Sequence, residues 1–244
     1  MGREHTDAGR MPGARRDRCS VAVNVDAMTR MAQVYAARDT DELVAHYDAW
    51  AADYDRQIGE EMGYSGPAEA TAALSRVVPK TAAVLDVGAG TGLVGVALHA
   101  RGYRNLTAAD VSETMLRVAE RKSVYRTLHV VDLDRGLPWG SAAFAAVIGV
   151  GVYTSGHASA RSIAELARVC RPSGYVCLSL RADASATGYL EEIDRLGQKG
   201  LFASRIDGPP FDCFPKAAIR RLMRIVTLQV AARPEAVGRA PEAT

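Results

Sequence analysis

The chain has 244 residues, of which 48% are hydrophobic and 24% are charged, and its formal net charge at pH 7 is +2. This length and composition are typical of one globular domain with attached segments, and they exclude a chain that is disordered throughout. A charge so close to zero gives no support to a nucleic-acid-binding protein, which would carry a basic excess.

No stretch of the sequence approaches 18 apolar residues, and no signal-peptide pattern is present. We therefore expect a cytoplasmic protein that does not associate with membranes. The cysteines show no paired spacing, which favours reduced thiols and gives no indication of a metal site. They are Cys19, Cys170, Cys177 and Cys213. The sequence gives no information on the oligomeric state.

The two ends of the chain differ in composition from the middle. About the first twenty residues are rich in Arg and Gly and contain no apolar run, and the last dozen are similar; we set the bounds of the two segments at residues 1–23 and 233–244. Such segments bury too little apolar surface to fold, so we predict a disordered tail at each end. Between the tails we expect N-terminal helices over residues 24–80 and the main domain over residues 81–232.

Three aromatic residues lie on one face of a predicted helix in the N-terminal region. Tyr47, Trp50 and Tyr54 follow the spacing i, i+3 and i+7, which places their rings on the same side. Two interpretations are open: the rings pack onto a sheet as an apolar stripe, or they cover a ligand. Composition alone favours packing.

Residues 84–92 read Val-Leu-Asp-Val-Gly-Ala-Gly-Thr-Gly, an apolar strand that leads directly into three glycines. Such a loop brings bare backbone against a ligand at the carboxyl end of a buried strand, and the amides of the next helix point at that ligand. A dinucleotide site would need Gly-x-Gly-x-x-Gly, but here the third glycine comes one residue early and Leu93 follows it. No Gly-Lys-Ser/Thr follows, which excludes a Walker loop.

Two further predicted strands lead into a carboxylate. The run 106–110 ends in Asp110, and the run 128–131 is followed by Asp132. An acid at the tip of the second strand is placed to bind both hydroxyls of a ribose. Taken singly, Asp110 could instead cap the helix that opens near Ser112, and Asp132 could be an ordinary turn residue. Together with Asp86, they form a series of acids at the ends of successive strands, which favours a ligand site.

Predicted strands and helices alternate through the main domain. Strands are expected near residues 82–87, 105–110, 127–131, 144–150 and 174–181. Helices are expected near residues 92–101, 113–121, 159–170 and 187–198. This alternation predicts an α/β fold with a doubly wound parallel sheet. Residues 200–206 and 222–230 look like two more strands without a full helix between them, which predicts a closing antiparallel pair.

The glycine loop, Asp110, and Asp132 before Leu137-Pro138-Trp139 resemble the motifs of class I S-adenosylmethionine (SAM)-dependent methyltransferases. Within that class, Tyr47-Asp48-Ala49-Trp50 and the stretch Gly149-Val150-Gly151-Val152-Tyr153-Thr154-Ser155-Gly156-His157 resemble the Williams–Beuren syndrome region methyltransferase-like proteins. The resemblance covers about residues 40–231 and implies a Rossmann-like, seven-stranded, mostly parallel sheet. Ala145 replaces a common Asp and Ser173 a common Gly, and these departures weaken the subgroup assignment.

The resemblance implies that the chain binds SAM and forms S-adenosylhomocysteine (SAH). The glycine loop would hold the methionine portion, with Asp86 fixing the loop and reaching the cofactor amine through water. Asp110 would bind the ribose and Asp132 the adenine, while residues 24–80 would form a lid whose rings attract the sulfonium. The residues expected to bind the cofactor are Tyr47, Tyr54, Asp86, Gly88, Ala89, Gly90, Asp110, Val111, Met115, Asp132, Leu133, Gly149 and Val150.

The implied reaction is the in-line transfer of a methyl group to an oxygen or nitrogen atom of a small molecule. If the acceptor needs a base, His157 is the first candidate, and Tyr153 and His46 are weaker ones. His157 could instead only cap the helix that follows it. Two alternatives also stay open. One is a protein of the same fold that binds SAM without methylating, as a regulator or as a catalyst of another rearrangement. The other is a nucleotide-binding module or another Rossmann-like enzyme that does not use SAM, and Leu93 in place of a third dinucleotide glycine counts against it.

Sequence marks of other substrate classes are missing. The chain has no Asn/Asp-Pro-Pro-Tyr tetrapeptide and no Pro-Cys nucleophile, which methyltransferases acting on bases carry. One basic cluster is present, and a solvated helix face explains it, so we expect no nucleic-acid partner. The cluster consists of Lys216, Arg220, Arg221 and Arg224.

Overall fold

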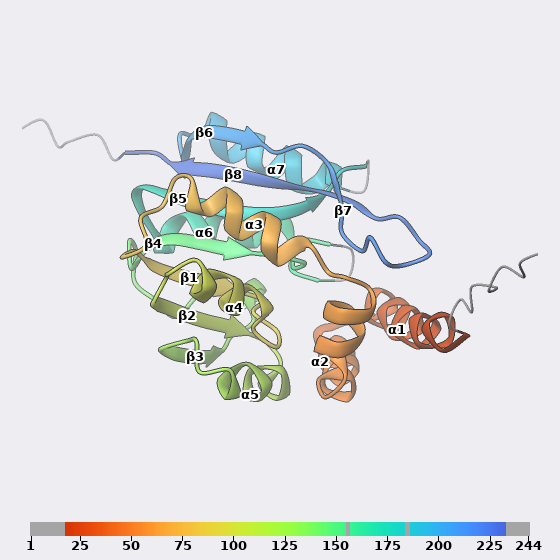
Figure 1. The fold of residues 1–244 in the computed structure, drawn as a ribbon. Coiled ribbons are helices and arrows are strands. Elements are labelled where there is room, and N and C mark those ends of the chain that lie inside the picture. Colours follow the sequence, from red (N-terminus) through yellow and green to blue (C-terminus); the bar gives the residue numbers. More distant parts are fainter. Residues whose placement is uncertain (1–17, 155–156, 184–185, 233–244) are drawn as a thin grey trace, which may run out of the picture.

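The computed structural model describes residues 18–154, 157–183 and 186–232 of the chain (Figure 1). The predicted tails lie largely outside these ranges. Helix α1 (Arg18–Ala36), however, begins inside the segment that we expected to be disordered. The other helical segments before the sheet are α2 (Thr40–Trp50), the π-helix η1 (Asp55–Glu61) and α3 (Gly66–Ser75). Helical segments thus make up most of the N-terminal region, as expected.

One sheet organises the rest of the molecule, with the strand order β3-β2-β1-β4-β5-β8-β6 and with the short β7 paired to β8. The strands are β1 (Ala83–Val87), β2 (Asn105–Asp110), β3 (Thr127–Val130), β4 (Phe144–Gly149), β5 (Cys170–Arg181), β6 (Phe202–Asp207), β7 (Phe211–Asp212) and β8 (Leu222–Val230). Strands β1 to β5 pair in parallel, and β8 is antiparallel to both β5 and β6. The predicted α/β fold, with a mostly parallel sheet and a closing antiparallel pair, is confirmed.

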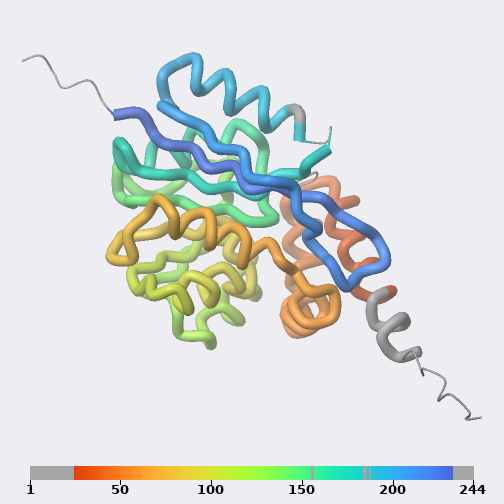
Figure 2. The backbone as a smooth tube through the Cα atoms, turned by 45° about the horizontal axis from the view of Figure 1, so that its top comes forward, coloured from red at the N-terminus to blue at the C-terminus, as the bar shows by residue number. Residues whose placement is uncertain are grey.

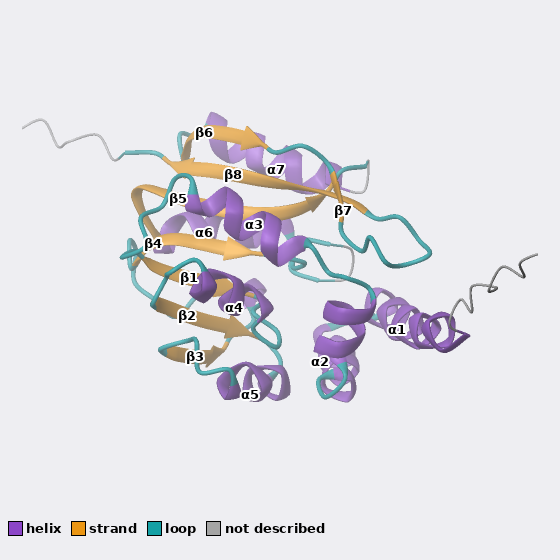
Figure 3. Ribbon diagram, viewed as in Figure 1, coloured by secondary structure: helices purple, strands orange, loops and turns teal. Residues whose placement is uncertain are grey.

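Helices cover both faces of this sheet (Figure 3). The remaining helical segments are α4 (Leu93–Ala100), α5 (Glu113–Arg121), η2 (Leu133–Arg135), η3 (Ala160–Ser162), α6 (Ile163–Val169) and α7 (Thr187–Gln198). Successive strand residues point to opposite faces: Val84 packs in the cluster beneath α3 and α4, whereas Leu85 packs in the cluster beneath α6 and α7. A strand buried on both faces explains the continuous apolar run before the glycine loop.

The helices α1, α2 and η1 lie beside the edge at which the parallel strands end (Figure 1). The segment between β6 and β8 runs next to them, as Figure 2 shows from a second direction. Several hydrogen bonds join the segments: for example, the Ser65 hydroxyl donates to the Asp212 carbonyl over 2.8 Å, and Lys216 Nζ donates to the Glu60 carbonyl over 2.9 Å. The segment between β6 and β8 thus helps to hold the N-terminal helical region in place.

Strand β5 begins at Cys170, four residues before the predicted start. Residues 171–174 form an irregularity in the strand, because Phe144 pairs with Cys170 but Ala146 already pairs with Tyr175. A Cβ at Gly174 would come within 2.6 Å of the Ala145 carbonyl oxygen, so only glycine fits there. The two departures from the subgroup pattern, Ala145 and Ser173, both lie at this irregularity and not among the residues that line the cavity described below.

No helix within the described ranges is long and apolar enough to cross a membrane. In the same ranges, no group of three or more His, Cys, Asp or Glu residues comes together as a possible metal site. The thiols of Cys170, Cys177 and Cys213 are buried and form no disulfide.

Candidate functional site

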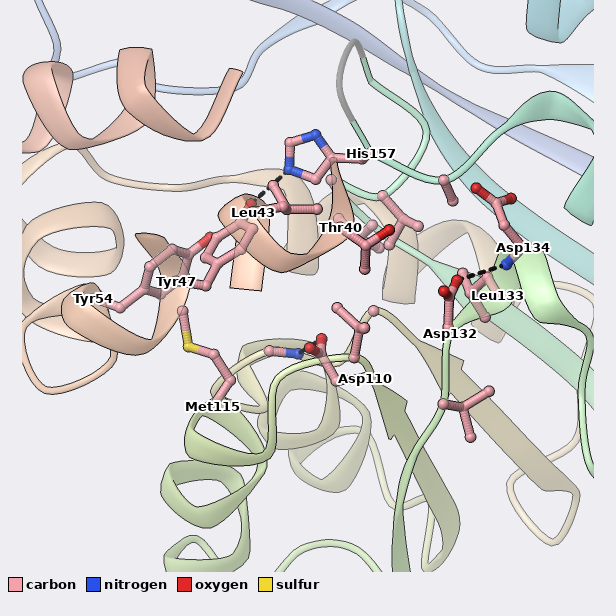
Figure 4. A pocket seen from close by; sticks show the side chains of 18 residues that line it. Thr40, Leu43, Tyr47, Tyr54, Asp110, Met115, Asp132, Leu133, Asp134 and His157 are labelled. Atoms are coloured by element: carbon pink, nitrogen blue, oxygen red, sulfur yellow. Dashed lines mark hydrogen bonds between the residues drawn. The ribbon is translucent and has the colours of Figure 1, made fainter. Parts of the chain in front are cut away.

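A cavity lies at the carboxyl edge of the sheet, between the glycine loop, the N-terminal helices and the loops that follow β3 and β4 (Figure 4). Regions that are far apart in sequence converge on it. The predicted site residues that line it are Tyr47, Tyr54, Gly88, Gly90, Asp110, Val111, Met115, Asp132, Leu133, Val150 and His157.

The backbone conformation of the loop favours glycine at two positions. Gly88 and Gly90 have φ values of 62° and 53°, a region that favours glycine. A Cβ at Gly88 would lie 2.1 Å from Cγ2 of Val152, so the loop after β4 packs directly against this glycine. A Cβ at Gly90 would meet nothing within 4 Å, and Gly90 lines the cavity. The loop therefore offers bare backbone to a ligand.

Asp110, at the end of β2, joins the glycine loop to the segment that opens α5. Its Oδ2 accepts a hydrogen bond from the Gly90 N–H over 2.7 Å, and its Oδ1 accepts one from the Ser112 N–H over 2.9 Å. The N-cap of α5 is Ser112, whose hydroxyl oxygen accepts from the Met115 N–H over 3.0 Å. Burial raises the pKa of Asp110, and the backbone N–H groups oppose that rise. Since each carboxylate oxygen has two lone pairs, Asp110 keeps acceptor capacity toward the cavity.

Asp86 lies beneath the glycine loop and is only 1% exposed. Its Oδ2 accepts a hydrogen bond from the Tyr125 hydroxyl over 2.6 Å, while its Oδ1 has no hydrogen-bond partner within the described part of the chain. Burial raises the pKa of Asp86 to about 7, against the opposing effect of the Tyr125 hydrogen bond. Tyr125 in turn accepts from the Gly95 N–H over 3.0 Å, so Asp86 connects the glycine loop to α4.

The segment after β3 contributes the third acid of the predicted series. Asp132 lines the cavity and also caps η2, because its Oδ1 accepts from the Asp134 N–H over 2.9 Å. Asp134 accepts hydrogen bonds from the N–H and the hydroxyl of Ser159 over 3.0 and 2.7 Å, which ties this segment to the chain that follows β4. The two interpretations of Asp132, as a turn residue and as a ligand-facing acid, are therefore compatible.

Of the three aromatic residues on one face of the N-terminal helix, one packs among helices and two line the cavity, so each of the two interpretations applies to part of the face. Trp50 is 2% exposed, and its Nε1 donates to Oε1 of Gln57 over 2.6 Å within the packed N-terminal helices. Tyr47 and Tyr54 line the cavity instead, with their ring centroids 6.2 Å apart. Both tyrosines have a pKa above the ordinary phenol value, chiefly because they are buried.

Each of these tyrosines precedes an aspartate that fastens the N-terminal helices to the main domain. Asp48 accepts a hydrogen bond from the Ser112 hydroxyl over 2.6 Å. Asp55 accepts one from the Thr91 hydroxyl over 2.5 Å and forms an ion pair of the same length with Lys122. The two Tyr-Asp pairs thus turn their rings to the cavity and their carboxylates to the segments around it.

His157 lies in the loop after β4 and reaches the same cavity. Its Nε2 is 2.7 Å from the Tyr47 hydroxyl, and its Nδ1 is 3.1 Å from Oγ1 of Thr154. Its ring also meets that of Tyr35 edge-on, with the centroids 5.6 Å apart. The alternative that His157 caps the next helix is not favoured, because Ser159 holds the N-cap position of η3.

Four of the predicted residues do not line the cavity: Asp86, Ala89, Gly149 and Tyr153. Tyr153 is fully buried, and its hydroxyl lies 3.0 Å from Oγ of Ser162. This geometry favours a packing role for Tyr153 over a catalytic one. His46, the other weak candidate, also lies outside the lining and sits 4.0 Å from the Glu42 carboxylate.

The cavity also contains residues that the sequence analysis missed: Thr40, Leu43, Val131, Asp134, Gly151, Val152 and Ala158. A signal was present for two of them. Thr40 and Leu43 precede Tyr47 by seven and four positions, so they share its helical face. The loop residues carry no such signal, because their position depends on how β4 and the glycine loop pack.

The basic cluster does not lie on a helix, so our explanation of it was wrong. Within the described ranges its residues lie in the irregular segment before β8 and on β8 itself. Lys216 binds the Glu60 carbonyl, and Arg224 lies 3.9 Å from the Asp207 carboxylate. The guanidinium of Arg221 stacks over the ring of Tyr35, 4.8 Å from its centroid.

Comparisons with known proteins agree with this geometry. A methyltransferase domain family matches residues 84–174. The human methyltransferase-like protein 27 is 32% identical over 192 residues, which covers 75% of this chain and 78% of that protein.

Crystal structures of methyltransferases share the fold. The Burkholderia thailandensis 1,6-didemethyltoxoflavin-N1-methyltransferase, with 1,6-didemethyltoxoflavin and SAH bound, is 19% identical with a TM-score of 0.57; the match covers 80% of this chain and 91% of that one. The magnesium protoporphyrin IX methyltransferase of Synechocystis PCC 6803, with SAM bound, is 18% identical with a TM-score of 0.54, covering 90% of this chain and 100% of that one.

Proposed function

The chain belongs to the class I SAM-dependent methyltransferases, and from this premise we propose that it methylates an oxygen or nitrogen atom of a small molecule. The observation that carries the proposal is the hydrogen bond between Tyr47 and His157 at the wall of the cavity, where it can receive a proton from an acceptor. The Burkholderia enzyme, whose structure contains 1,6-didemethyltoxoflavin, supports a small-molecule acceptor. The identity to the human protein supports placement in the Williams–Beuren syndrome region subgroup.

The residues of the cavity fit SAM. Gly90 faces open space beside the unspent lone pairs of Asp110, which suits a ribose with two hydroxyl donors. Asp86 lies beneath the loop and outside the cavity wall, and its Oδ1, which has no hydrogen-bond partner within the described ranges, suits an ammonium group reached through a water molecule. On this assignment Asp132 and Leu133 hold the adenine, and the rings of Tyr47 and Tyr54 lie toward the sulfonium, which aromatic faces attract.

When bound, SAM supplies a methyl group on a positively charged sulfur. The chain's own residues then align the acceptor and exclude water, and such alignment contributes up to about 7–11 kcal/mol to rate acceleration. The raised pKa of Tyr47 keeps its phenol protonated near neutral pH, so the hydroxyl can donate to Nε2 of His157. The acceptor passes its proton to the Tyr47 oxygen while the Tyr47 proton moves to His157.

Calorimetric titration with SAM, SAH and NAD tests the cofactor site. We expect SAM and SAH to bind and NAD not to bind. Asp110→Asn should weaken SAH binding at least tenfold, because one good hydrogen bond to a charged group contributes roughly 1.5–3 kcal/mol. Glu113→Gln, which removes an exposed acid three residues away, is the matched control and should bind like the wild type.

Circular dichroism of each variant should show that it is folded. If a folded wild-type chain binds neither SAM nor SAH, the site assignment is wrong. If it binds both but forms no SAH with any acceptor, the alternative of a SAM-binding protein that does not methylate gains support.

A further inference from the structure

A second cavity adjoins the first at Tyr47 and Tyr54. Its walls come from α1, from the α2–η1 region and from the segment before β8, and they are mainly aromatic or apolar. Tyr35, Trp50, Tyr64 and Phe214 provide much of this surface. Such a site suits a flat apolar molecule, because aromatic walls contribute a large contact area and specific ring geometries.

The two cavities meet at the residues proposed for the chemistry. Tyr47, Tyr54 and Gly151 line both of them. His157 lines the first and Thr154 the second, and these two side chains are 3.1 Å apart. A molecule in the second cavity would therefore lie against Tyr47 and Tyr54, next to the first cavity.

Arg221 is the only charged residue in the described lining of the second cavity. Its guanidinium lies over the Tyr35 ring and forms no ion pair with the described carboxylates. The nearby Asp212 accepts through its Oδ1 from the backbone N–H groups of Phe214 and Arg221, and its carboxylate is not ion-paired with the Arg221 guanidinium. A cation among aromatic walls without a carboxylate partner is suited to bind an anionic group of a ligand.

Tyr35 links this cation to the proposed base. The Arg221 guanidinium carbon is 4.8 Å from the centroid of the Tyr35 ring, and the His157 ring is 5.6 Å from the same centroid. Both groups thus contact the same ring, so the guanidinium carbon of Arg221 and the centroid of the His157 ring are at most about 10 Å apart. A small aromatic acceptor can reach both at once.

We propose that the second cavity is the acceptor pocket. We further propose that the acceptor is an aromatic carboxylate that carries a hydroxyl or amino group on the ring, opposite the carboxylate. This inference rests on the proposed methyltransferase function. The carboxylate binds Arg221, and the hydroxyl or amino group faces Tyr47. The acceptor atom forms a bond to the methyl carbon of SAM as the bond between that carbon and sulfur breaks. The electron pair of the broken bond stays on sulfur, which gives SAH. The proton of the acceptor passes through Tyr47 to His157.

Binding of matched probes to the SAH-saturated full chain tests the proposal. The probes are 4-hydroxybenzoate and 4-aminobenzoate, with 4-hydroxybenzamide and 4-aminobenzamide as their neutral counterparts. We expect both carboxylates to bind at least about tenfold more tightly than the amides, which corresponds to one charge-assisted contact. Arg221→Met should abolish this preference and leave SAH affinity unchanged, and Arg221→Lys should restore part of it.

Arg224→Met is the matched control, because Arg224 lies three residues further along and faces Asp207 outside the cavity. It should retain the full preference for the carboxylates. Equal binding of carboxylates and amides by the wild type, no binding of either carboxylate at millimolar concentration, or an equal loss in both arginine variants would overturn the proposal. Loss of SAH binding by the wild type would instead contradict the function on which it rests.

Discussion

Burial holds the pKa of Asp86 at about 7, against an ordinary value of 3.8, so this carboxyl makes the stability of the protein depend on pH. The folded state keeps the proton up to about pH 7, whereas the unfolded state loses it near pH 4. The contribution of Asp86 to stability is therefore fully present below about pH 4 and is lost as the pH rises to 7. The total loss is up to about 4 kcal/mol.

We expect Asp86→Asn to stabilise the ligand-free protein, because the amide cannot ionise and still accepts a hydrogen bond from Tyr125. The free energy of unfolding of the variant should exceed that of the wild type by an amount that grows by roughly 1.4 kcal/mol per pH unit between pH 5 and 7. Urea denaturation at several pH values measures this. Glu120→Gln, at an exposed position on α5, should show no such trend. A difference that stays constant with pH would mean that Asp86 is ionised in the folded protein.

The hydrogen bond between Tyr47 and His157 makes a separate prediction at the residue scale. Tyr47→Phe removes the hydroxyl but keeps the ring, so we expect kcat to fall about 100-fold, within the range for general base catalysis, with SAH affinity little changed. His157→Gln should lose the decline in rate at acidic pH that protonation of an essential base produces. The formation of SAH from SAM, measured with the fastest acceptor across a pH range, reports both effects.

Tyr153→Phe is the matched control for these variants. It removes a phenol hydroxyl that contacts Ser162 in the core, so it should lower thermal stability and leave the pH profile intact. The role of His157 is contradicted if its variant keeps the wild-type pH profile.

At the scale of the elements, the sequence predicted the sheet well, because each buried strand is a short apolar run between clear turn residues. The strand that begins at Ala83 and the helix that follows Gly92 lie within one or two residues of the predicted positions. The start of β5 was wrong, since its bulge depends on the Ala145 carbonyl of the neighbouring strand. Nothing in the local sequence encodes that contact.

The candidate site divides in the same way. Residues directly after a strand or on a periodic helix face, such as Asp110 and Tyr47, were predicted to lie in it, and both line the cavity. The anchoring roles of Asp48 and Asp55 were missed, because each depends on a partner more than thirty residues away. Arg221 was assigned to a solvated helix face for the same reason: its stacking on Tyr35 joins the two ends of the described chain.

At the scale of the whole molecule, the N-terminal helices and the main domain enclose the first cavity between them, so a ligand there contacts both. Binding of a ligand to the folded state alone stabilises it by RT ln(1 + [L]/Kd), about 2.7 kcal/mol at a hundredfold excess over Kd. If both parts hold SAH, this stabilisation extends to α2 and η1 as well as to the glycine loop. Hydrogen exchange of the backbone amides, with and without SAH, should show slower exchange in both regions.

The variant Asp55→Asn tests the protection of the N-terminal helices independently of that of the main domain. The substitution removes the ion pair with Lys122 and weakens the contact with Thr91, so the N-terminal helices should lose much of their protection while the glycine loop keeps it. Asp53→Asn is the control, because Asp53 pairs with Arg56 within the same segment and does not reach the main domain. Protection limited to the main domain in the wild type would show that α2 and η1 do not close over the cofactor. Tyr47 could then not lie between the two cavities when SAH is bound, and the proposed path of the proton would fail together with the lid.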